Sequence, residues 1–449
     1  MAPATCFSAR FGIQTHLVSS SALPMRREHN RRMFNPRASS GPISRKEEVV
    51  IVGAGIAGLT TAVSLHKLGV RSLVLEQGDS IRTGGTTLTL LKNGWSVLDS
   101  IGVGEELRNG FLQIHGYSAD FSLVMRSEDG SQLRSFLFEE EAPGQELRAV
   151  ERRLLLETLS SKLPPNSISF SSRVKSIKRQ ETGDTLLELA NGTRVLAKIL
   201  IGCDGVRSSI AKWMGFPEPS YVGHCAFRGL ALYPEGQPFK PTVNLFYGRG
   251  RRAGFFPVSQ TKVYWFICFN SPSPGPRIND PKVLKKEALS LMRGWPSELI
   301  NIMQNTPDDV VVKTPLVDRW LWPGFTPSVS SGQVVVVGDA WHPMTPYLGQ
   351  GACCALEDAV ALSTRLASAL NGSDVTVEEA LRAYGHERWG SIFPMTALAN
   401  LLGNFMQWDD PVVCEIRNKI MIPWVVSLAP ILEPNNFAFK FLEPAVASK

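Results

Sequence analysis

Residues 48–76 have the sequence EVVIVGAGIAGLTTAVSLHKLGVRSLVLE. An apolar run at 48–52 leads directly into a glycine-rich turn, and a stretch rich in Ala, Leu and Val follows it. A second apolar run, 71–75, ends at Glu76. Short apolar runs of this length are typical of buried strands, and the intervening stretch is long enough for a helix. The segment therefore predicts a strand, a tight turn, a helix and a second, parallel strand.

The glycine spacing predicts a dinucleotide site in that turn. Gly53 lets the turn close, Gly55 lets the backbone approach a pyrophosphate, and Gly58 lets the helix pack on the strand. The helix would direct its positive end at the phosphates. Glu76 is placed to accept hydrogen bonds from both ribose hydroxyls, and its charge would repel a 2′-phosphate, which disfavours NADP at this site. The predicted contact residues are Gly53, Gly55, Ile56, Ala57, Gly58 and Glu76.

Two later segments repeat the pattern of an apolar run followed by a polar turn. Residues 196–201 lead into GCDGVRSS, and residues 333–337 lead into GDAWHP. Strands that are buried on both faces of a parallel sheet have such continuous apolar runs. The dinucleotide-binding domain is therefore expected to be discontinuous in sequence.

The chain between these segments changes character. β-Rich segments separated by turn residues occur at 221–232, 242–247, 252–258 and 262–269, which predicts an antiparallel sheet. A helix is expected at 281–293, and the chain from 351 onward is mostly helical, most clearly at 352–370. The expected fold class is α/β, a discontinuous Rossmann-like dinucleotide-binding domain with an inserted antiparallel β-sheet substrate domain and C-terminal helices. The expected divisions are a leader at 1–46, the two parts of the dinucleotide domain at 47–215 and 326–400, the substrate domain at 216–325 and a helical region at 401–449.

The net charge of +6 is concentrated in the first 46 residues, which hold eight Lys and Arg and one acid, Glu28. The remaining chain is close to neutral, which argues against nucleic-acid binding. An Arg- and Ser-rich, acid-poor leader is typical of an organelle transit peptide. Few arginines in the first 25 residues favour the chloroplast, and the mitochondrion or a retained basic tail stays open.

Seven cysteines without a CxxC pair suggest neither a disulfide framework nor a zinc site, and no other metal site is predicted. No apolar run reaches the roughly 20 residues of a spanning helix. The run at 420–432 is interrupted by Pro423 and Pro430. It is expected to pack as a helix pair, and peripheral membrane contact stays open.

The three strand–turn motifs together resemble the single-component FAD-dependent aromatic hydroxylases of the p-hydroxybenzoate hydroxylase type. The similarity is greatest to the plant monooxygenase branch that is related to zeaxanthin epoxidase and FAD-dependent urate hydroxylase, and it spans about residues 49–400. The resemblance implies an oxidoreductase that binds FAD, with NADH or NADPH as a transient co-substrate. Dioxygen and a small organic molecule would be the other substrates.

The resemblance also implies roles for particular residues. Asp339 would hydrogen-bond the ribityl chain, and Arg152 and Val174 would lie near the adenosine diphosphate and adenine. Asp204 would contribute to flavin and nicotinamide function. An exposed helix charge, an ordinary core residue and a turn-forming Asp stay open as alternatives for Arg152, Val174 and Asp204. The third motif would contact the flavin through Pro346, Gly349, Gln350, Gly351, Ala352 and Cys353.

For the substrate, the resemblance points to Arg252 and Tyr264. In the urate hydroxylase relatives an Arg and a Tyr twelve residues apart flank the sheet segment that lines the substrate site, and these two residues match that spacing. A place in the sheet core is the alternative for Tyr264. No catalytic acid or base is identified, and His224 and His342 are expected to be structural.

The resulting functional prediction is ring hydroxylation of a small phenolic or heteroaromatic compound through a flavin hydroperoxide. Epoxidation or oxidation of a lipophilic isoprenoid is one alternative. A catalytically silent FAD-binding redox protein is the other. An inward-pointing Arg252 would favour an anionic substrate, whereas an apolar channel toward residues 420–432 would favour the isoprenoid. A monomer and a homodimer are both compatible with the sequence.

Overall fold

The computed structural model describes residues 43–81, 87–112, 122–137, 140 and 144–425. The expected leader therefore lies almost wholly outside the described residues, as does the end of the apolar run at 420–432. Arg45 and Lys46, which the sequence analysis assigned to the leader, are the first residues of strand β1 (Arg45–Val52). The first described strand thus begins slightly before the expected boundary.

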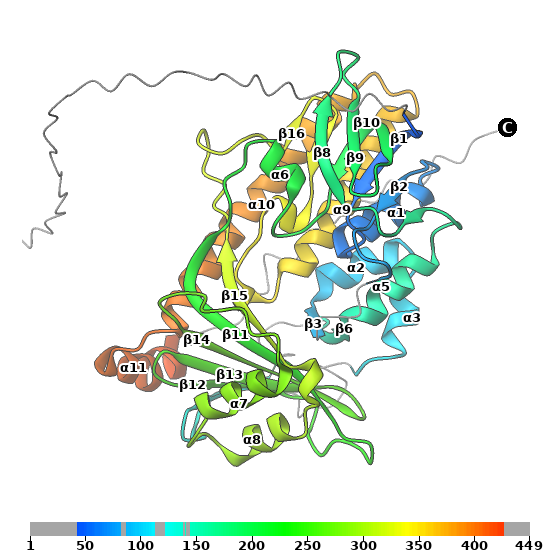
Figure 1. The fold of residues 1–449 in the computed structure, drawn as a ribbon. Helices are drawn as coiled ribbons and strands as arrows, with labels where there is room; N and C mark the ends of the chain where they lie inside the picture. Colours follow the sequence, from blue (N-terminus) through cyan, green and yellow to red (C-terminus); the bar gives the residue numbers. More distant parts are fainter. Residues whose placement is uncertain (1–42, 82–86, 113–121, 138–139, 141–143, 426–449) are drawn as a thin grey trace, which may run out of the picture. The chain divides into compact units, whose positions relative to one another are not determined.

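An eight-stranded sheet forms the expected Rossmann-like core (Figure 1). Its central strands β17 (Val334–Val336), β10 (Arg194–Gly202), β1 and β2 (Leu73–Leu75) are parallel neighbours in that order. All three predicted strand–turn segments therefore join one sheet, although they are far apart in the sequence. The outer strands are β7 (Ile168–Ser169), β8 (Val174–Arg179), β9 (Thr185–Leu189) and β16 (Ser330–Ser331).

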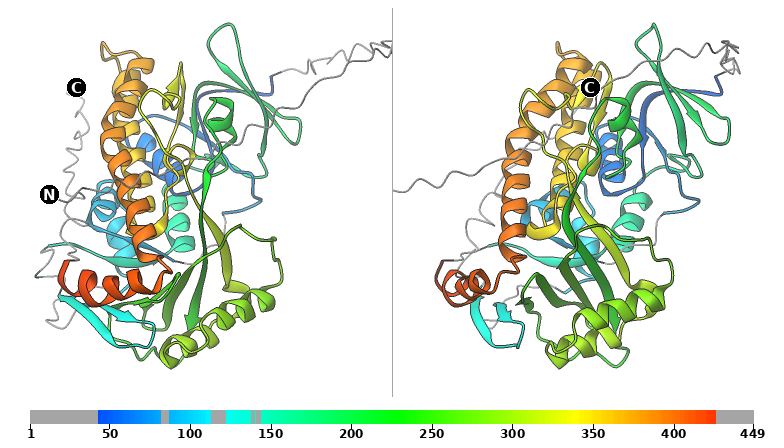
Figure 2. Two further views of the ribbon diagram at one scale, coloured as in Figure 1. Left: turned by 90° about the vertical axis from the view of Figure 1, so that its left-hand side faces the viewer. Right: turned by 60° about the vertical axis from the view of Figure 1, so that its left-hand side comes forward.

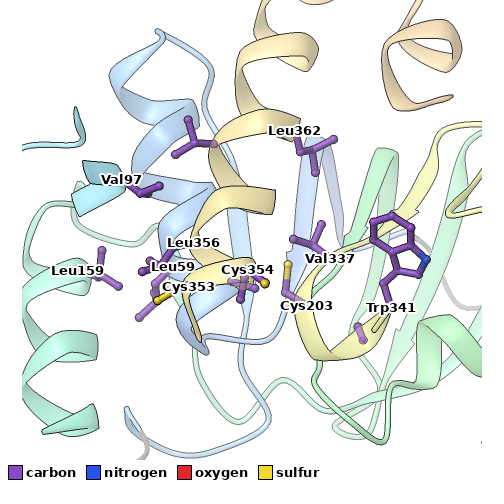
Figure 3. Close-up of a cluster of buried hydrophobic side chains, with 14 of the residues drawn as sticks. Leu59, Val97, Leu159, Cys203, Val337, Trp341, Cys353, Cys354, Leu356 and Leu362 are labelled. Atoms are coloured by element: carbon purple, nitrogen blue, oxygen red, sulfur yellow. The ribbon is translucent and has the colours of Figure 1, made fainter. Parts of the chain in front are cut away.

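Helices α1 (Ile56–Lys67) and α9 (Gly351–Leu370) pack against each other beside the central strands. Leu59 of α1 and Cys353, Cys354 and Leu356 of α9 meet in one buried cluster with Cys203 (Figure 3). Helix α10 (Val377–Met406) runs along α9 (Figure 2) and begins with a capping box between Thr376 and Glu379. The other helices attached to this domain are α2 (Lys92–Ser100), α3 (Gly104–Arg108), α5 (Arg152–Ser161) and α6 (Ser209–Trp213).

The second sheet has seven strands in the order β15-β11-β14-β13-β12-β4-β5. Four of them match the predicted segments: β11 (Ser220–Leu232), β12 (Val243–Tyr247), β13 (Arg251–Ser259) and β14 (Lys262–Asn270). β15 (Val312–Asp318) adds an edge. β4 (Ser122–Ser127) and β5 (Gln132–Leu137) come from the segment that the sequence analysis placed in the first part of the dinucleotide domain. β4 pairs with β12 in parallel, so the sheet is mixed.

Alternation along the strands gives the second sheet two different faces. One face carries Phe227, Phe255 and Trp265, which are buried against α7 (Pro281–Leu291) and α8 (Ser297–Gln304). The opposite face carries His224, Arg228, Arg252, Tyr264 and Phe266. We call it the Tyr347 side, because Tyr347 of the third motif contacts Arg252 and His224 there.

Short elements complete the described chain. β3 (Thr87–Leu90) and β6 (Arg148–Glu151) form a two-stranded sheet, and the single-turn helices span Asp308–Val310, Gly338–Ala340 and Pro346–Leu348. α11 (Pro411–Ile416) and a π-helical segment (Arg417–Val425) follow α10. Helix α10 passes without interruption through the expected boundary at residue 400. Within the described residues, no helix is both long and apolar enough to span a membrane.

Candidate functional site

Strand register brings the three glycine-containing turns to one edge of the sheet. Val52 pairs with Gly202, and Gly202 pairs with Val336. The turns that begin at Gly53, at Cys203 and at Gly338 therefore leave the carboxyl ends of adjacent strands side by side. In open parallel sheets this edge is where ligands bind.

The first turn packs so closely that two of its glycines are required. A Cβ atom on Gly58 would lie 1.9 Å from the Gly53 carbonyl oxygen, and one on Gly53 would lie 2.4 Å from the Cys203 carbonyl oxygen. Gly55 is different, because the nearest atom that a Cβ on it would meet, Arg152 Nη2, would be 3.9 Å away. The backbone of Gly55 is therefore open toward a ligand, as a pyrophosphate-binding turn requires.

Helix α1 begins in that turn without an acidic residue in its first turn and without a side-chain cap at Gly55. Its first amide groups, including those of Ile56 and Ala57, carry the positive end of the helix dipole. An anion such as a pyrophosphate fits this position. The open backbone at Gly55 and the uncapped start of α1 therefore fit the predicted dinucleotide site.

Glu76 lies at the end of β2 with its side chain 3% exposed. Its Oε2 accepts a hydrogen bond from the Ala54 amide at 2.8 Å, and its Oε1 accepts one from the Gly78 amide at 2.9 Å. The carboxylate is thus fixed against the glycine turn. Val174 begins β8 close by, since the amide of Ser172 donates to the Glu76 carbonyl.

Arg152 and Asp339 approach the same turn from two other segments. Arg152 is the first residue of α5, and its guanidinium lies beside Gly55. Asp339 is exposed to solvent, but the protein that surrounds it partly desolvates its carboxyl and raises the pKa, while the charges of His342 and Arg152 oppose that rise. A carboxylate and a guanidinium therefore both lie near the first turn, and their charges interact.

The third motif ends in the start of α9. Gly349 has φ of +67°, a conformation that glycine adopts readily, and Gln350 precedes the helix without a side-chain cap. Pro346 is exposed, while Gly351 and Ala352 are half-buried, so the backbone amides at the helix start are accessible. Such an end can stabilise negative charge on a flavin ring.

The side chains of two predicted cofactor contacts, Cys353 and Asp204, have partners within the protein. The Cys353 side chain is fully buried against Gly94 of α2, so only its backbone faces the helix start. Burial raises the pKa of the Cys353 thiol to about 12. Asp204 accepts hydrogen bonds at the start of α6, from the Ser209 amide at 2.6 Å and from the Ser209 hydroxyl at 2.9 Å, while Ser208 is the N-cap of this helix. A structural role for Asp204 accounts for all of these contacts.

Sequence analysis missed a buried polar network behind the third motif. Arg388 of α10 donates to Asp358 at 2.7 Å and to Glu357 at 2.7 Å, and the exposed fraction of each of the three side chains is below 5%. Asp358 also accepts from the Gly338 amide at 3.1 Å and from His342. These contacts and the Arg388 charge lower the Asp358 pKa against the opposing effect of burial.

The network also reaches α2. Asn93 Nδ2 donates to Glu357 Oε1 at 2.7 Å and to Gln350 Oε1 at 3.2 Å. Gln350 is thus a buried support of the loop as well as a predicted cofactor residue. Two adjacent acids in the apolar stretch GACCALEDAVALS were the available sequence signal.

On the second sheet, Arg252 is buried and lies on the Tyr347 side. Its guanidinium is 4.9 Å from the Tyr347 ring centroid and 5.2 Å from that of Phe266. Its Nε has no hydrogen-bond partner among the described residues. Tyr347 Oη is 2.8 Å from His224 Nδ1, and burial, followed by the charge of Arg252, lowers the His224 pKa.

Tyr264 is on the same face as Arg252, but farther along β14. It pairs with Phe256, and the two ring centroids are 5.0 Å apart. The two predicted substrate residues therefore share a face of the sheet, and Tyr264 lies four residues along β14 from Cys268, the residue that pairs with Arg252. Tyr264 is 7% exposed, in keeping with a place at the edge of the core.

One hollow of the structure is unrelated to these residues. It has a volume of about 540 Å³ and lies at the amino-terminal ends of β1 and β2, where Arg45, His66 and Arg71 contribute to its lining. The predicted site lies at the opposite, carboxyl ends. Among the described residues, no group of three His, Cys, Asp or Glu side chains is arranged to hold a metal ion.

The fold and the three adjoining turns define a FAD-binding flavoprotein of the monooxygenase type. The model of a family described as FAD binding domain matches residues 46–392, and the chain belongs to this family of FAD-dependent hydroxylases. The chain is 36% identical over 359 residues to Monooxygenase 2 of Arabidopsis thaliana, covering 77% of this chain and 86% of that protein. It is 28% identical to salicylate hydroxylase asL1 of Sarocladium schorii, covering 71% of each chain.

The crystal structure of Klebsiella pneumoniae HpxO complexed with FAD and uric acid has the same fold. Its TM-score is 0.74, at 22% sequence identity, covering 87% of this chain and 95% of that one. The match confirms the predicted α/β architecture with two sheets and C-terminal helices.

Proposed function

We propose that this protein is an NAD(P)H-dependent monooxygenase that hydroxylates a small anionic phenolic or heteroaromatic compound. The observation that carries the proposal is the guanidinium of Arg252. It is buried on the Tyr347 side, stacked between two aromatic rings, and forms no ion pair in the described structure. A buried cation without a counter-charge is costly, and an anionic ligand would offset that cost.

FAD, when bound, would supply the oxygen-transfer chemistry. The chain would hold its pyrophosphate at Gly55 and the start of α1, and its ribose at Glu76. Asp339 would bind the ribityl chain, and the amides at the start of α9 would face the pyrimidine edge. Arg252 would orient the substrate anion, and the apolar and aromatic surroundings would exclude water.

The absorption spectrum and NAD(P)H oxidation test this proposal directly. Protein that starts at Ile43 should be yellow, and one compound in a panel of phenols, purines and carotenoid precursors should accelerate NADH or NADPH oxidation and be recovered with one added oxygen. Bound flavin without any response across the panel would support a silent FAD-binding protein instead. A carotenoid precursor as the responding compound would establish the isoprenoid alternative.

Adjacent arginines on β13 provide a matched pair of variants. The Arg252→Met variant should raise KM for the anionic substrate about 100-fold, because it removes a charge-assisted contact. Arg251 lies on the opposite face, where it donates to the Leu291 carbonyl at 2.6 Å. The Arg251→Met variant should therefore leave KM within about twofold. Equal effects of the two substitutions would contradict the assignment.

The expected chloroplast location is a separate part of the proposal. It rests on the composition of residues 1–46 and on the plant relatives. A fusion of residues 1–46 to a fluorescent protein should enter chloroplasts, and a fusion that lacks them should stay in the cytosol. Delivery to mitochondria would establish the alternative destination.

A further inference from the structure

Two arginines, Arg228 and Arg252, lie on the Tyr347 side of the sheet. Arg228 of β11 pairs with Phe266 of β14, and Arg252 of β13 pairs with Cys268 of β14. Directly paired residues share a face of the sheet, and so do alternate residues along one strand. Since β14 separates the two strands and the pairs are offset by two residues, the arginine Cα atoms are about 12 Å apart.

Phe266 lies between these arginines, and its ring leans to one side. A Cβ atom on Gly254 of β13 would be 2.6 Å from the ring, so the ring lies over Gly254 and away from β11. Both Phe266 and Arg228 are only half-buried, although β11 and β14 are interior strands. The sheet therefore presents an aromatic surface with a guanidinium on each side of it.

Neither guanidinium is neutralised by the described protein. Arg228 makes no side-chain hydrogen bond or ion pair with the described residues, and the Tyr347 side of β11 to β14 carries no Asp or Glu. Nearby lysines behave differently, since Lys313 binds Glu287 at 2.6 Å and Lys262 binds Glu151 at 2.7 Å. Two guanidinium groups near one ring, neither of them with a counter-charge, are energetically unfavourable unless anions bind to them.

The chemistry of Cys268 supports the closeness of the two charges. Burial raises the pKa of its thiol, and the charges of Arg252 and then Arg228 oppose that rise. Both guanidinium groups therefore act on one atom at the centre of the face.

We propose that Arg228 is a second substrate-binding residue and that the substrate is an aromatic compound with two anionic groups, whose ring lies over Phe266 between Arg228 and Arg252. A guanidinium binds a carboxylate through two parallel hydrogen bonds, and a ring stacks on phenylalanine with an offset. The inference rests on the proposed function, since it narrows the substrate class at the same site. It adds a charge requirement that Arg252 alone does not impose.

Hydroxybenzoates that differ by one carboxylate test the inference. The FAD-loaded protein would be titrated with phenol, 4-hydroxybenzoate and 4-hydroxyisophthalate, and binding would be followed by the change in flavin absorbance and by the thermal shift, independently of turnover. The wild-type protein should bind the dicarboxylate at least tenfold more tightly than the monocarboxylate. NADPH and NADH oxidation would be measured in parallel.

The variants separate the two arginines. Arg228→Met should weaken dicarboxylate binding about tenfold and monocarboxylate binding much less, and Arg228→Lys should restore part of the preference. Arg252→Met should weaken both ligands, and the control Arg251→Met should change neither. Retention of the wild-type spectrum would show that each variant is folded.

Each outcome bears on the inference. A wild-type protein with no preference for the dicarboxylate, or an Arg228→Met variant that keeps the preference, would overturn it. Tight dicarboxylate binding without stimulated oxidation of NADH or NADPH would support the role of Arg228 and refute hydroxylation. Stimulated oxidation by the monocarboxylate alone would support hydroxylation and refute the second arginine site.

Discussion

Replacing Arg388 by Met would remove the guanidinium that bridges Glu357 and Asp358 in the buried network. Both carboxylates are almost fully buried, and each accepts a hydrogen bond of 2.7 Å from Arg388. Removing one partner of a buried ion pair typically costs about 3 to 5 kcal/mol, because it leaves charge uncompensated. For a chain of this length that corresponds to a fall in Tm of roughly 4 to 6 °C.

The same two helices contain a control for this substitution. Arg365 of α9 donates to Glu387 of α10 at 2.6 Å, but those side chains are 40% and 39% exposed. An exposed pair of this kind contributes about 0 to 1 kcal/mol. The Arg365→Met variant should therefore lower Tm by about 1 °C or less. Each variant removes one arginine that links α9 and α10. The difference between their Tm shifts therefore measures the effect of burying the ion pair.

The assay is the thermal unfolding of the apoprotein, followed by FAD titration. The lowered Asp358 pKa adds a pH signature, since a depressed carboxyl pKa stabilises the fold above the unfolded pKa and loses this effect as pH falls through the folded pKa. The gap in Tm between wild type and Arg388→Met should thus stay nearly constant from pH 7 to pH 4 and narrow as the pH falls below 3.8, the ordinary pKa of an Asp carboxyl. FAD affinity should also fall, because Asp358 anchors the Gly338 amide. Equal Tm shifts for Arg388→Met and Arg365→Met would refute the reasoning.

Three further substitutions and one chemical modification test the site. Gly55→Leu should abolish FAD retention with little change in the Tm of the apoprotein, and a yellow Gly55→Leu protein would contradict this prediction. Gly58→Ala should instead lower the Tm by several degrees, because the new Cβ would meet the Gly53 carbonyl. Asp339→Asn should weaken FAD binding about tenfold. Because burial raises the Asp339 pKa, the same variant should raise apoprotein Tm more at pH 8 than at pH 4, and a uniform shift would argue against that origin. Cys353 should resist iodoacetamide at pH 8 in native protein and react after unfolding, as mass spectrometry can show, given its raised pKa.

The first sheet could be predicted from the sequence because short local patterns identify its central strands. Each central strand is a short apolar run that ends at glycine, and the register that aligns Val52, Gly202 and Val336 follows from the parallel pairing of such runs. FAD binding and the family were likewise confirmed, since three motifs in order carry them. NAD(P)H use and the substrate remain predictions of the resemblance.

Other features depend on contacts that no local pattern encodes. β4 joins the second sheet through parallel pairing with β12, which lies more than a hundred residues later in the chain. The sequence of β4 alone does not indicate this partner. The link between Arg388 and Asp358 likewise joins two helices whose surfaces look ordinary in sequence. Asp204 lies in a motif with a family role, yet its nearest donors belong to the helix that follows it. In each case tertiary packing decides between local alternatives.

The discontinuity of the first sheet has a consequence for how the molecule is assembled. β1 is complete at Val52, but its parallel partner β10 begins only at Arg194, and β17 follows at Val334. Closing such long loops is entropically costly and slow compared with forming local hairpins. During synthesis, the glycine turn at residue 53 would therefore emerge long before Asp339 and the start of α9. A chain shortened before residue 351 should have no complete cofactor site, so FAD capture would be a late step that follows nearly complete translation.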